Sequence, residues 1–128
     1  MQNKAELRSL MRRKRRDYVS NLTEDAGVKL LEQLLPLLQS VSKIAIYYAD
    51  NSEINLRALM EYCLKHSLEL YAPVAKRNSR VMSFELITDL CLRDIFYPEN
   101  YELAAEIKWY NLDLVILPLL AVDHVGYR

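Results

Sequence analysis

The sequence is poor in glycine: its 128 residues contain two, where an average usage of about 7% would give roughly nine. Glycine-rich loops cradle phosphates with backbone N–H groups, so this scarcity indicates that the chain has no such loop of its own. Cysteine is equally rare, and Cys63 and Cys91 form no Cys-x-x-Cys pair, which argues against a zinc site. The longest apolar stretch, residues 112–122, is interrupted by Asp113 and Pro118 and is too short for a membrane helix.

The rest of the composition is typical of one globular domain. Apolar residues make up 52% of the chain and charged residues 27%, which excludes a disordered protein. The N-terminus has charges but no apolar stretch after them, so no signal peptide is predicted. Together with the few cysteines, this predicts a cytoplasmic location.

Charge is balanced over the chain but concentrated at its start. Residues 1–16 hold seven Lys and Arg against one Glu, and the remainder is acidic. Lys4, Arg8 and Arg12 recur once per turn of a predicted helix, so they would share a face able to clamp a polyphosphate. A solvated basic face is the simpler interpretation of this spacing. Nucleic-acid binding is a further alternative, disfavoured by the acidic body and the lack of interleaved aromatic residues.

Hydrophobic spacing predicts alternating helices and strands. Helices are expected at 3–20, at 24–35 with Pro36 ending or kinking the helix, and at 54–67 with Asn51 or Ser52 as cap. Strands are expected at 43–48, 68–73, 80–86 and 112–117, with one helical turn at 88–93, no clear structure at 94–110 and a loop at 123–128. Because the strands are apolar throughout and alternate with helices, they predict a parallel sheet that is buried on both faces.

Ligands of such sheets bind beyond the carboxyl ends of the strands. This rule places Tyr47–Glu53, Pro73–Lys76 and Pro118–Arg128 around one candidate site. Glu53 would lie between a strand and a helix, where it could bind substrate or simply stabilise the first turn of the helix.

Three further residues that could carry chemistry are given structural or neutral roles. Cys63 lies on an apolar helical stripe and is expected to be buried. His66 falls at a helix end, where it is expected to be structural. His124 belongs to no nucleophile motif, so a hydrolase triad is unsupported.

Five motifs follow one another over nearly the whole chain. They are Lys4-Ala-Glu-Leu-Arg8; Ile44-Ala-Ile-Tyr-Tyr48 with Ser52-Glu53-Ile54; Tyr71-Ala-Pro73-Val74; Met82-Ser-Phe84; and Leu112-Asp-Leu-Val-Ile-Leu-Pro118, which runs through Ala121-Val-Asp123 to Gly126-Tyr-Arg128. In order and spacing this set resembles the 5-formyltetrahydrofolate cyclo-ligase family, also called methenyltetrahydrofolate synthetases.

The resemblance implies a three-layer α/β fold with a mostly parallel sheet, shared with CoA-transferase-like proteins, of which this chain would be the N-terminal part. It implies an enzyme of folate and one-carbon metabolism that converts 5-formyltetrahydrofolate and ATP to 5,10-methenyltetrahydrofolate, ADP and phosphate, with Mg²⁺. Lys4 and Arg8 would contact the ATP phosphates. Glu53 would hold the folate and Tyr48 would line its pocket. Arg128 would open the nucleotide loop and take part in catalysis.

Two departures from the family pattern bear on activity. Where the family has Pro-Gly-Leu-Ala/Gly-Phe-Asp, this chain has Pro118-Leu-Leu-Ala-Val-Asp123, so Leu119 replaces a glycine and Val122 an aromatic residue. The glycine-rich loop that would follow Arg128, with its magnesium-binding acid, has no counterpart in the sequence.

We therefore expect residues 1–128 to form one incomplete domain that is inactive by itself. Its expected partners are 5-formyltetrahydrofolate and ATP, without a membrane or nucleic acid. Three alternatives remain. The chain could be a non-catalytic remnant that binds folate or a nucleotide, it could pair with a separate C-terminal fragment, or its basic helix could bind nucleic acid.

Overall fold

The computed structural model describes residues 3–50, 52–76, 80, 82–91, 96–97 and 106–127. Its helices are α1 (Lys4–Ser20), α2 (Ala26–Leu38) and α3 (Arg57–Lys65), followed by a 3₁₀ turn, η1 (Trp109–Asn111). Its strands are β1 (Lys43–Ala45), β2 (Glu69–Lys76), β3 (Met82–Ile87), β4 (Phe96–Tyr97), β5 (Glu106–Ile107) and β6 (Leu114–Val115). None of the helices in these ranges combines the length and hydropathy that a membrane span requires.

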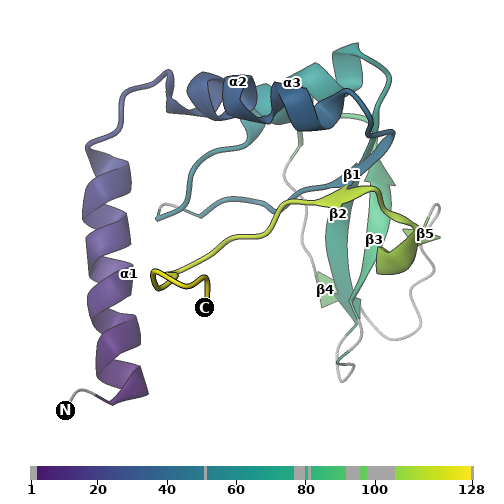
Figure 1. Cartoon of the computed structure of the whole chain (residues 1–128). Helices are drawn as coiled ribbons and strands as arrows, with labels where there is room; N and C mark the ends of the chain where they lie inside the picture. Colours follow the sequence, from purple (N-terminus) through teal and green to yellow (C-terminus); the bar gives the residue numbers. More distant parts are fainter. Residues whose placement is uncertain are drawn as a thin grey trace.

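The strands form one mixed sheet in the order β5-β3-β2-β1-β6, with β4 paired to β2 (Figure 1). β1 runs parallel to β2 and to β6, whereas β3 is antiparallel to both β2 and β5. The predicted α/β class is confirmed, but the mostly parallel sheet holds only in part. Residues 77–81 alone connect β2 to β3, and a parallel crossover needs a dozen residues or more. The predicted strands on either side of this link therefore pair as neighbours in opposite directions.

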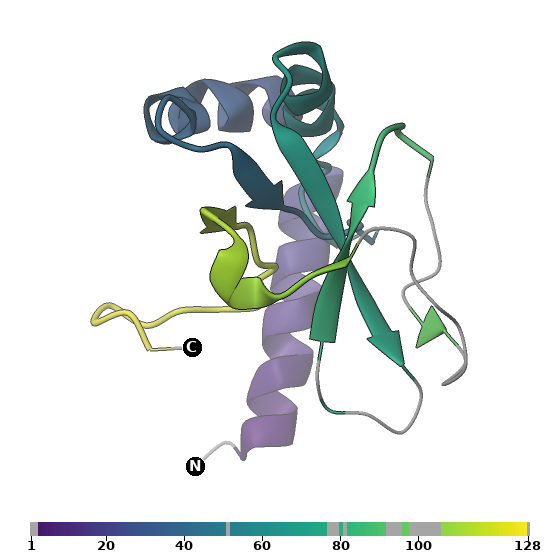
Figure 2. The same cartoon turned by 90° about the vertical axis from the view of Figure 1, so that its right-hand side faces the viewer.

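The main core lies between the sheet and the helix pair α2 and α3 (Figures 1 and 2). Ile44 of β1 and Leu70 of β2 are fully buried against α3, whose Leu59 and Cys63 are at most 1% exposed. The intervening residues Ala45 and Tyr71 point to the other face, where they form a smaller cluster with Phe84. Both faces of β1 and β2 are thus apolar and buried, as the continuous apolar runs predict.

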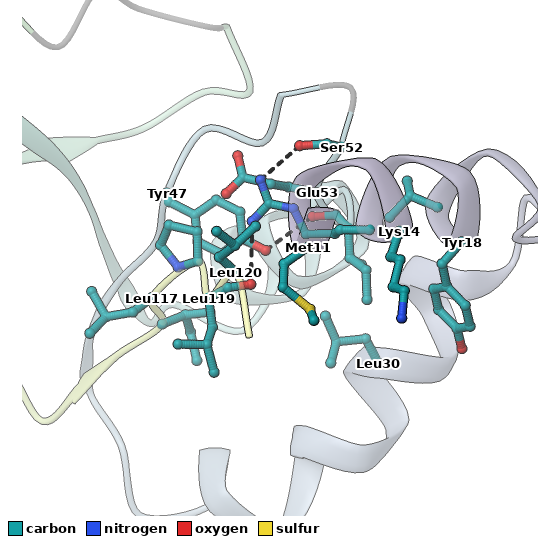
Figure 3. Close-up of a pocket in the computed structure, with 15 residues that line it drawn as sticks. Met11, Lys14, Tyr18, Leu30, Tyr47, Ser52, Glu53, Leu117, Leu119 and Leu120 are labelled. Atoms are coloured by element: carbon teal, nitrogen blue, oxygen red, sulfur yellow. Dashed lines mark hydrogen bonds between the residues drawn. The ribbon is translucent and has the colours of Figure 1, made fainter. Parts of the chain in front are cut away.

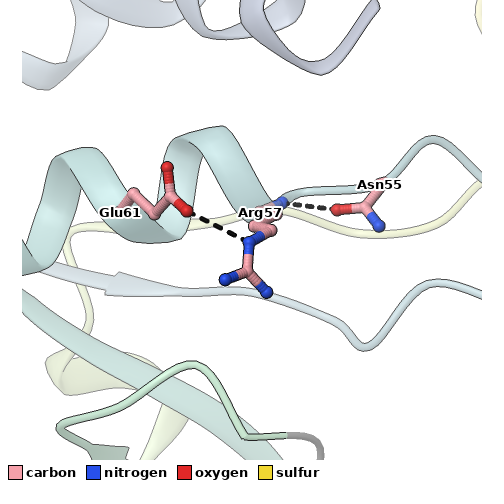
Figure 4. A network of polar contacts seen from close by, with 3 residues as sticks. All are labelled: Asn55, Arg57 and Glu61. Atoms are coloured by element: carbon pink, nitrogen blue, oxygen red, sulfur yellow. Dashed lines mark hydrogen bonds and ion pairs between the residues drawn. The ribbon is translucent and has the colours of Figure 1, made fainter. Parts of the chain in front are cut away.

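The helix ends depart from the predictions at two places. α2 continues through Pro36 to Leu38, because a proline in the last turn removes a single N–H donor and burial of Leu38 keeps the turn in place. α3 begins at Arg57, later than predicted, and its N-cap is Leu56, whose side chain makes no capping hydrogen bond; Ser52 therefore does not cap it. One residue earlier, Asn55 Oδ1 accepts the Arg57 N–H at 2.7 Å (Figure 4). Arg57 then pairs with Glu61 one turn later, with 3.1 Å between Nε and Oε1.

The remaining predictions concern the second half of the chain. Of the helical turn expected at 88–93, residues 88–91 are not helical, and 92–93 lie outside the described residues. The unassigned segment 94–110 contributes β4, β5 and the start of η1. The loop expected at the C-terminal end is present over residues 123–127.

Helix α1 stands apart from the packed body. It begins with a capping box, in which Asn3 and Glu6 bond each other's backbone N–H groups, and none of its residues is buried. Figure 1 shows two segments reaching from the sheet towards it: the connection after β1 and the chain after β6. The space between α1 and these two segments contains the candidate site.

Candidate functional site

Two adjoining clefts separate α1 from the body. The first has a volume of about 580 Å³ and lies between α1, the turn after β1 and the segment after β6 (Figure 3). The second, of about 660 Å³, lies between the N-terminal half of α1 and residues 118–123 with Tyr127. Met11 and the segment Pro118–Leu120 line both, so the clefts share one wall.

The sequence-predicted binding residues divide between these clefts. Glu53 lines the first cleft, and Lys4 and Arg8 line the second. Tyr48 lines neither and packs against the main core instead. Arg128 lies outside the described residues. Among the three strand-end segments, Tyr47–Glu53 and Pro118–Arg128 contribute lining residues. Of the segment Pro73–Lys76, the described side chains of residues 73–75 line neither cleft, because β2 runs on past β1 to pair with β3 and β4.

One face of α1 supplies side chains to both clefts. Lys4, Arg8, Met11 and Arg15 follow one another at spacings of three or four residues, which keeps them on a single face. Arg12 is exposed and lines neither cleft. Each step of four residues turns the helix by about 40° beyond a full turn, so Arg12 lies about 80° from Lys4. Of the three cations that the sequence groups in one row, Lys4 and Arg8 therefore line the second cleft and Arg12 does not.

The turn after β1 is held by its own side chains. The Asp50 carboxylate accepts the Ser52 N–H and the Ser52 hydroxyl, each at 2.7 Å. Glu53 in turn accepts the Asp50 N–H at 3.0 Å. Because α3 starts four residues later, Glu53 does not lie in its first turn, and the helix-dipole interpretation of this acid is wrong. The carboxylate instead closes the turn and borders the cleft.

Arg15 connects α1 to both facing segments. Its Nη2 donates to Ser52 Oγ at 2.8 Å and its Nη1 donates to the Leu119 carbonyl at 3.3 Å (Figure 3). Its Nε is buried and finds no acceptor among the described residues. The sequence interpretation overlooked Arg15, although it lies two turns after Arg8 on the same face, and that spacing is the signal that could have found it.

Local electrostatics follow from these contacts. The hydrogen bonds from Ser52 lower the pKa of Asp50, helped by the positive charges of Arg15 and Arg16. Burial raises the pKa of the Tyr47 hydroxyl, with a further contribution from the Glu53 charge. Tyr47 donates to the Ile54 carbonyl at 3.2 Å, which fixes the far side of the turn.

The second facing segment is positioned by Asp113. One oxygen of its carboxylate accepts the Ser42 N–H, the Ser42 hydroxyl and the Lys43 N–H at 2.9–3.0 Å, and these bonds lower the pKa of Asp113. They tie the start of β6 to the start of β1. The segment then leads to Leu119 and Val122, the two departures from the family pattern: Leu119 belongs to the shared wall and Val122 lines the second cleft.

The C-terminal end of the described chain is a compact turn. Asp123 Oδ1 accepts the Val125 and Tyr127 N–H groups, both at 2.9 Å, and Gly126 has a φ of 94°, which side-chain-bearing residues rarely adopt. No group of three His, Cys, Asp or Glu in the described ranges forms a metal-ligand set. The described acids near the clefts, Glu53 and Asp123, each accept backbone N–H groups.

The residues predicted to be structural are so. Cys63 is fully buried, and burial raises the pKa of its thiol to about 11. His66 ends α3, where its ring stacks on Tyr62 with centroids 4.0 Å apart and its Nδ1 lies 3.0 Å from the Tyr62 carbonyl oxygen.

Comparison with known proteins identifies the family. The model of the 5-formyltetrahydrofolate cyclo-ligase family matches residues 1–128. The chain belongs to the 5-formyltetrahydrofolate cyclo-ligase family. No curated protein matches it.

A solved cyclo-ligase relative has the same fold. The NMR structure of 5,10-methenyltetrahydrofolate synthetase from Aquifex aeolicus superposes with a TM-score of 0.65 and 26% sequence identity, over 95% of this chain. The matched region is 66% of the Aquifex chain, so this chain spans just under two thirds of that cyclo-ligase's length.

Proposed function

We propose that this chain supplies the folate-binding and phosphate-binding groups of an ATP-dependent 5-formyltetrahydrofolate cyclo-ligase. The observation that carries the proposal is the adjacency of the two clefts. Glu53 borders one and Lys4 and Arg8 border the other, with Met11 and Pro118–Leu120 as their common wall. Two ligands bound side by side in this way would be held with their reacting ends close together.

The chemistry divides between these groups. Glu53 would accept hydrogen bonds from polar N–H groups of the folate, while apolar side chains such as Ile116 and Leu120 cover its rings. Lys4 and Arg8 would hold the ATP phosphates and offset the charge that develops as a phosphoryl group passes to the formyl oxygen. Attack by the second folate nitrogen and loss of phosphate would then close the methenyl ring.

Magnesium is assigned no ligands here. The family uses Mg²⁺ to neutralise phosphate charge, but the described acids near the clefts are engaged with backbone N–H groups and do not form a ligand set.

Arg128, as the opening residue of the nucleotide loop, keeps its proposed catalytic role. For residues 1–128 taken by themselves we expect ligand binding without turnover, since this stretch contains two glycines and no glycine-rich segment that could cradle phosphates with backbone N–H groups.

Titration calorimetry of the purified chain with 5-formyltetrahydrofolate and, separately, with ATP tests this proposal. Glu53→Gln is expected to weaken folate binding roughly 10- to 100-fold and leave ATP binding unchanged, because a charge-assisted hydrogen bond contributes about 1.5–3 kcal/mol. Arg8→Gln is expected to weaken ATP binding by a similar factor and to leave folate binding unchanged. Absence of heat with either ligand would contradict the binding roles, and ATP-dependent formation of methenyltetrahydrofolate would contradict the expected lack of turnover.

A further inference from the structure

Arg15 joins three segments that are distant in sequence. Its guanidinium reaches the Ser52 hydroxyl after β1 and the Leu119 carbonyl after β6, at 2.8 and 3.3 Å. Among the described residues these are the hydrogen bonds that link side chains of α1 to the rest of the protein; the other α1 side-chain bonds stay within the helix and its caps. Because α1 has no buried residue, its position depends strongly on this one side chain.

The contacts of Arg15 continue as far as Glu53. The Ser52 side chain is 9% exposed; its hydroxyl oxygen accepts a hydrogen bond from the Arg15 guanidinium, and its hydroxyl donates a hydrogen bond to the Asp50 carboxylate. The Asp50 backbone N–H then donates to the Glu53 carboxylate. Three hydrogen bonds therefore connect the Arg15 guanidinium to Glu53, so that a displacement of the guanidinium would change the position of the acid that borders the first cleft.

Arg15 also shares a helix face with the residues of the second cleft. Arg8 lies two turns earlier on that face, and a helix moves as a rigid rod over such a length. The planar guanidinium of an arginine carries several N–H donors in a rigid arrangement, so it can bond two acceptors at fixed positions. The ammonium of a lysine lacks this fixed arrangement of donors. No carboxylate of the described residues lies within ion-pair distance of Arg15, so its bonds to Ser52 and Leu119 set its position.

We propose that Arg15 is a positioning residue that fixes the spacing between the two clefts by fastening α1 to the turn at Ser52 and to the carbonyl of Leu119. The identity of the two ligands, folate and ATP, rests on the proposed function, whereas the attachment of α1 to the body rests on the hydrogen bonds of Arg15. Binding of either ligand would draw α1 onto the body through this contact, so that each ligand favours the other.

Amide hydrogen exchange tests the fastening without any ligand. In Arg15→Gln, we expect the Ser52 and Asp50 amides to exchange roughly tenfold faster, while the Ile46 amide, which bonds the Tyr71 carbonyl in the sheet, is unchanged. Arg13→Gln is the matched control, because Arg13 lies on the opposite side of α1 and lines neither cleft. Unchanged exchange at Ser52 and Asp50 in the Arg15 variant would overturn the proposal.

Calorimetry with both ligands tests the coupling. We expect 5-formyltetrahydrofolate to bind the unmodified chain at least fivefold more tightly in the presence of ATP, and this enhancement to vanish in Arg15→Gln. A residue that merely supported the fold would weaken folate binding equally with and without ATP and leave the enhancement in place. Arg15→Lys keeps the charge but not the fixed arrangement of donors, so full recovery of the coupling by lysine would overturn the role assigned to the bridging geometry.

The two experiments separate the two proposals. Faster exchange at Ser52 in Arg15→Gln, together with no ligand heat for the unmodified chain, would contradict the proposed function and support the fastening. Ligand binding by the unmodified chain with an enhancement that survives in Arg15→Gln would support the proposed function and contradict the role of Arg15.

Discussion

The body around α3 and the region around α1 are held together in different ways. Ile44, Leu59 and Leu70 in the body are at most 1% exposed, whereas α1 has no buried residue and meets the body through the Arg15 hydrogen bonds and the walls of two clefts. Burial of apolar surface provides most of the folding free energy, so stability resides in the body. The clefts lie where packing is sparse, as is usual for regions that must admit ligands.

The largest expected effect that separates the two regions is a change in folding free energy. Ile44→Ala removes a fully buried side chain from β1 and is expected to cost about 2–5 kcal/mol. Leu117→Ala, at a side chain that is 57% exposed in the cleft wall, is expected to cost less than about 0.5 kcal/mol. Urea denaturation of the two variants measures the contrast, and equal losses would contradict the division between body and clefts.

Thiol reactivity gives the next largest contrast, because the two cysteines differ in exposure. Burial raises the pKa of Cys63 from 9.0 to about 11, which lowers its thiolate fraction at pH 8 about a hundredfold. Cys91 is exposed. Alkylation at pH 8 followed by mass spectrometry should therefore label Cys91 at least about a hundredfold faster, and in denaturing urea the two rates should converge. Comparable rates in the folded protein would place Cys63 outside the core.

A smaller effect is expected at the boundary between the regions, where the turn after β1 leads into α3. Asn55→Ala removes the side-chain acceptor of the Arg57 N–H and is expected to cost about 1 kcal/mol in thermal or urea unfolding, the usual net contribution of a hydrogen bond. Glu61→Gln, which removes only the exposed partner of Arg57, should cost no more than about 0.5 kcal/mol. A loss at Glu61 as large as that at Asn55 would show that the ion pair, rather than the Asn55 hydrogen bond, fixes the start of α3.

The smallest expected effect is the pH dependence of the turn beside Arg15. The pKa of Asp50 is lowered below its ordinary 3.8, chiefly by hydrogen bonds from Ser52, so the ionised carboxylate stabilises the fold. That contribution is complete above the ordinary value and is lost as the pH falls through the lower folded value. The stability difference between the unmodified chain and Asp50→Asn should therefore shrink as the pH falls from 5 to 3. In a Ser52→Ala background the hydroxyl bond is lost but the backbone N–H of residue 52 still donates to Asp50, so the pH dependence should become smaller without disappearing. An unchanged pH dependence would assign it to the backbone N–H and the arginine charges rather than to the hydroxyl.

The body could be predicted from the sequence because its signals are local. The apolar runs around Ile44 and Leu70 and the stripe containing Cys63 gave both the elements and their burial. The antiparallel β2–β3 pair does not follow from apolar content, because apolar content does not specify strand direction; the short connection at 77–81 is the sequence signal that indicates it.

The site was less predictable because it depends on how segments meet. The spacing of Lys4 and Arg8 identified one cleft face, but Arg12 was included by spacing alone. The role of Arg15 is hard to predict because it is one of five consecutive basic residues, and only its hydrogen-bond acceptors distinguish it from the other four. The same holds for Ser52, which was expected to cap a helix and instead bonds Asp50 and receives Arg15.

The three hydrogen bonds accepted by Asp113 have a consequence for the opposite end of β6. Side chains alternate between the two faces of a strand, so a slip of one residue exchanges every inward position for an outward one. The hydrogen bonds of Asp113 thus fix the register of β6, and with it the positions of Ile116 and of the Leu119 carbonyl. An insertion or deletion of a single residue after Asp113 would turn Leu114 and Ile116 away from the main core and present Arg15 with a different carbonyl.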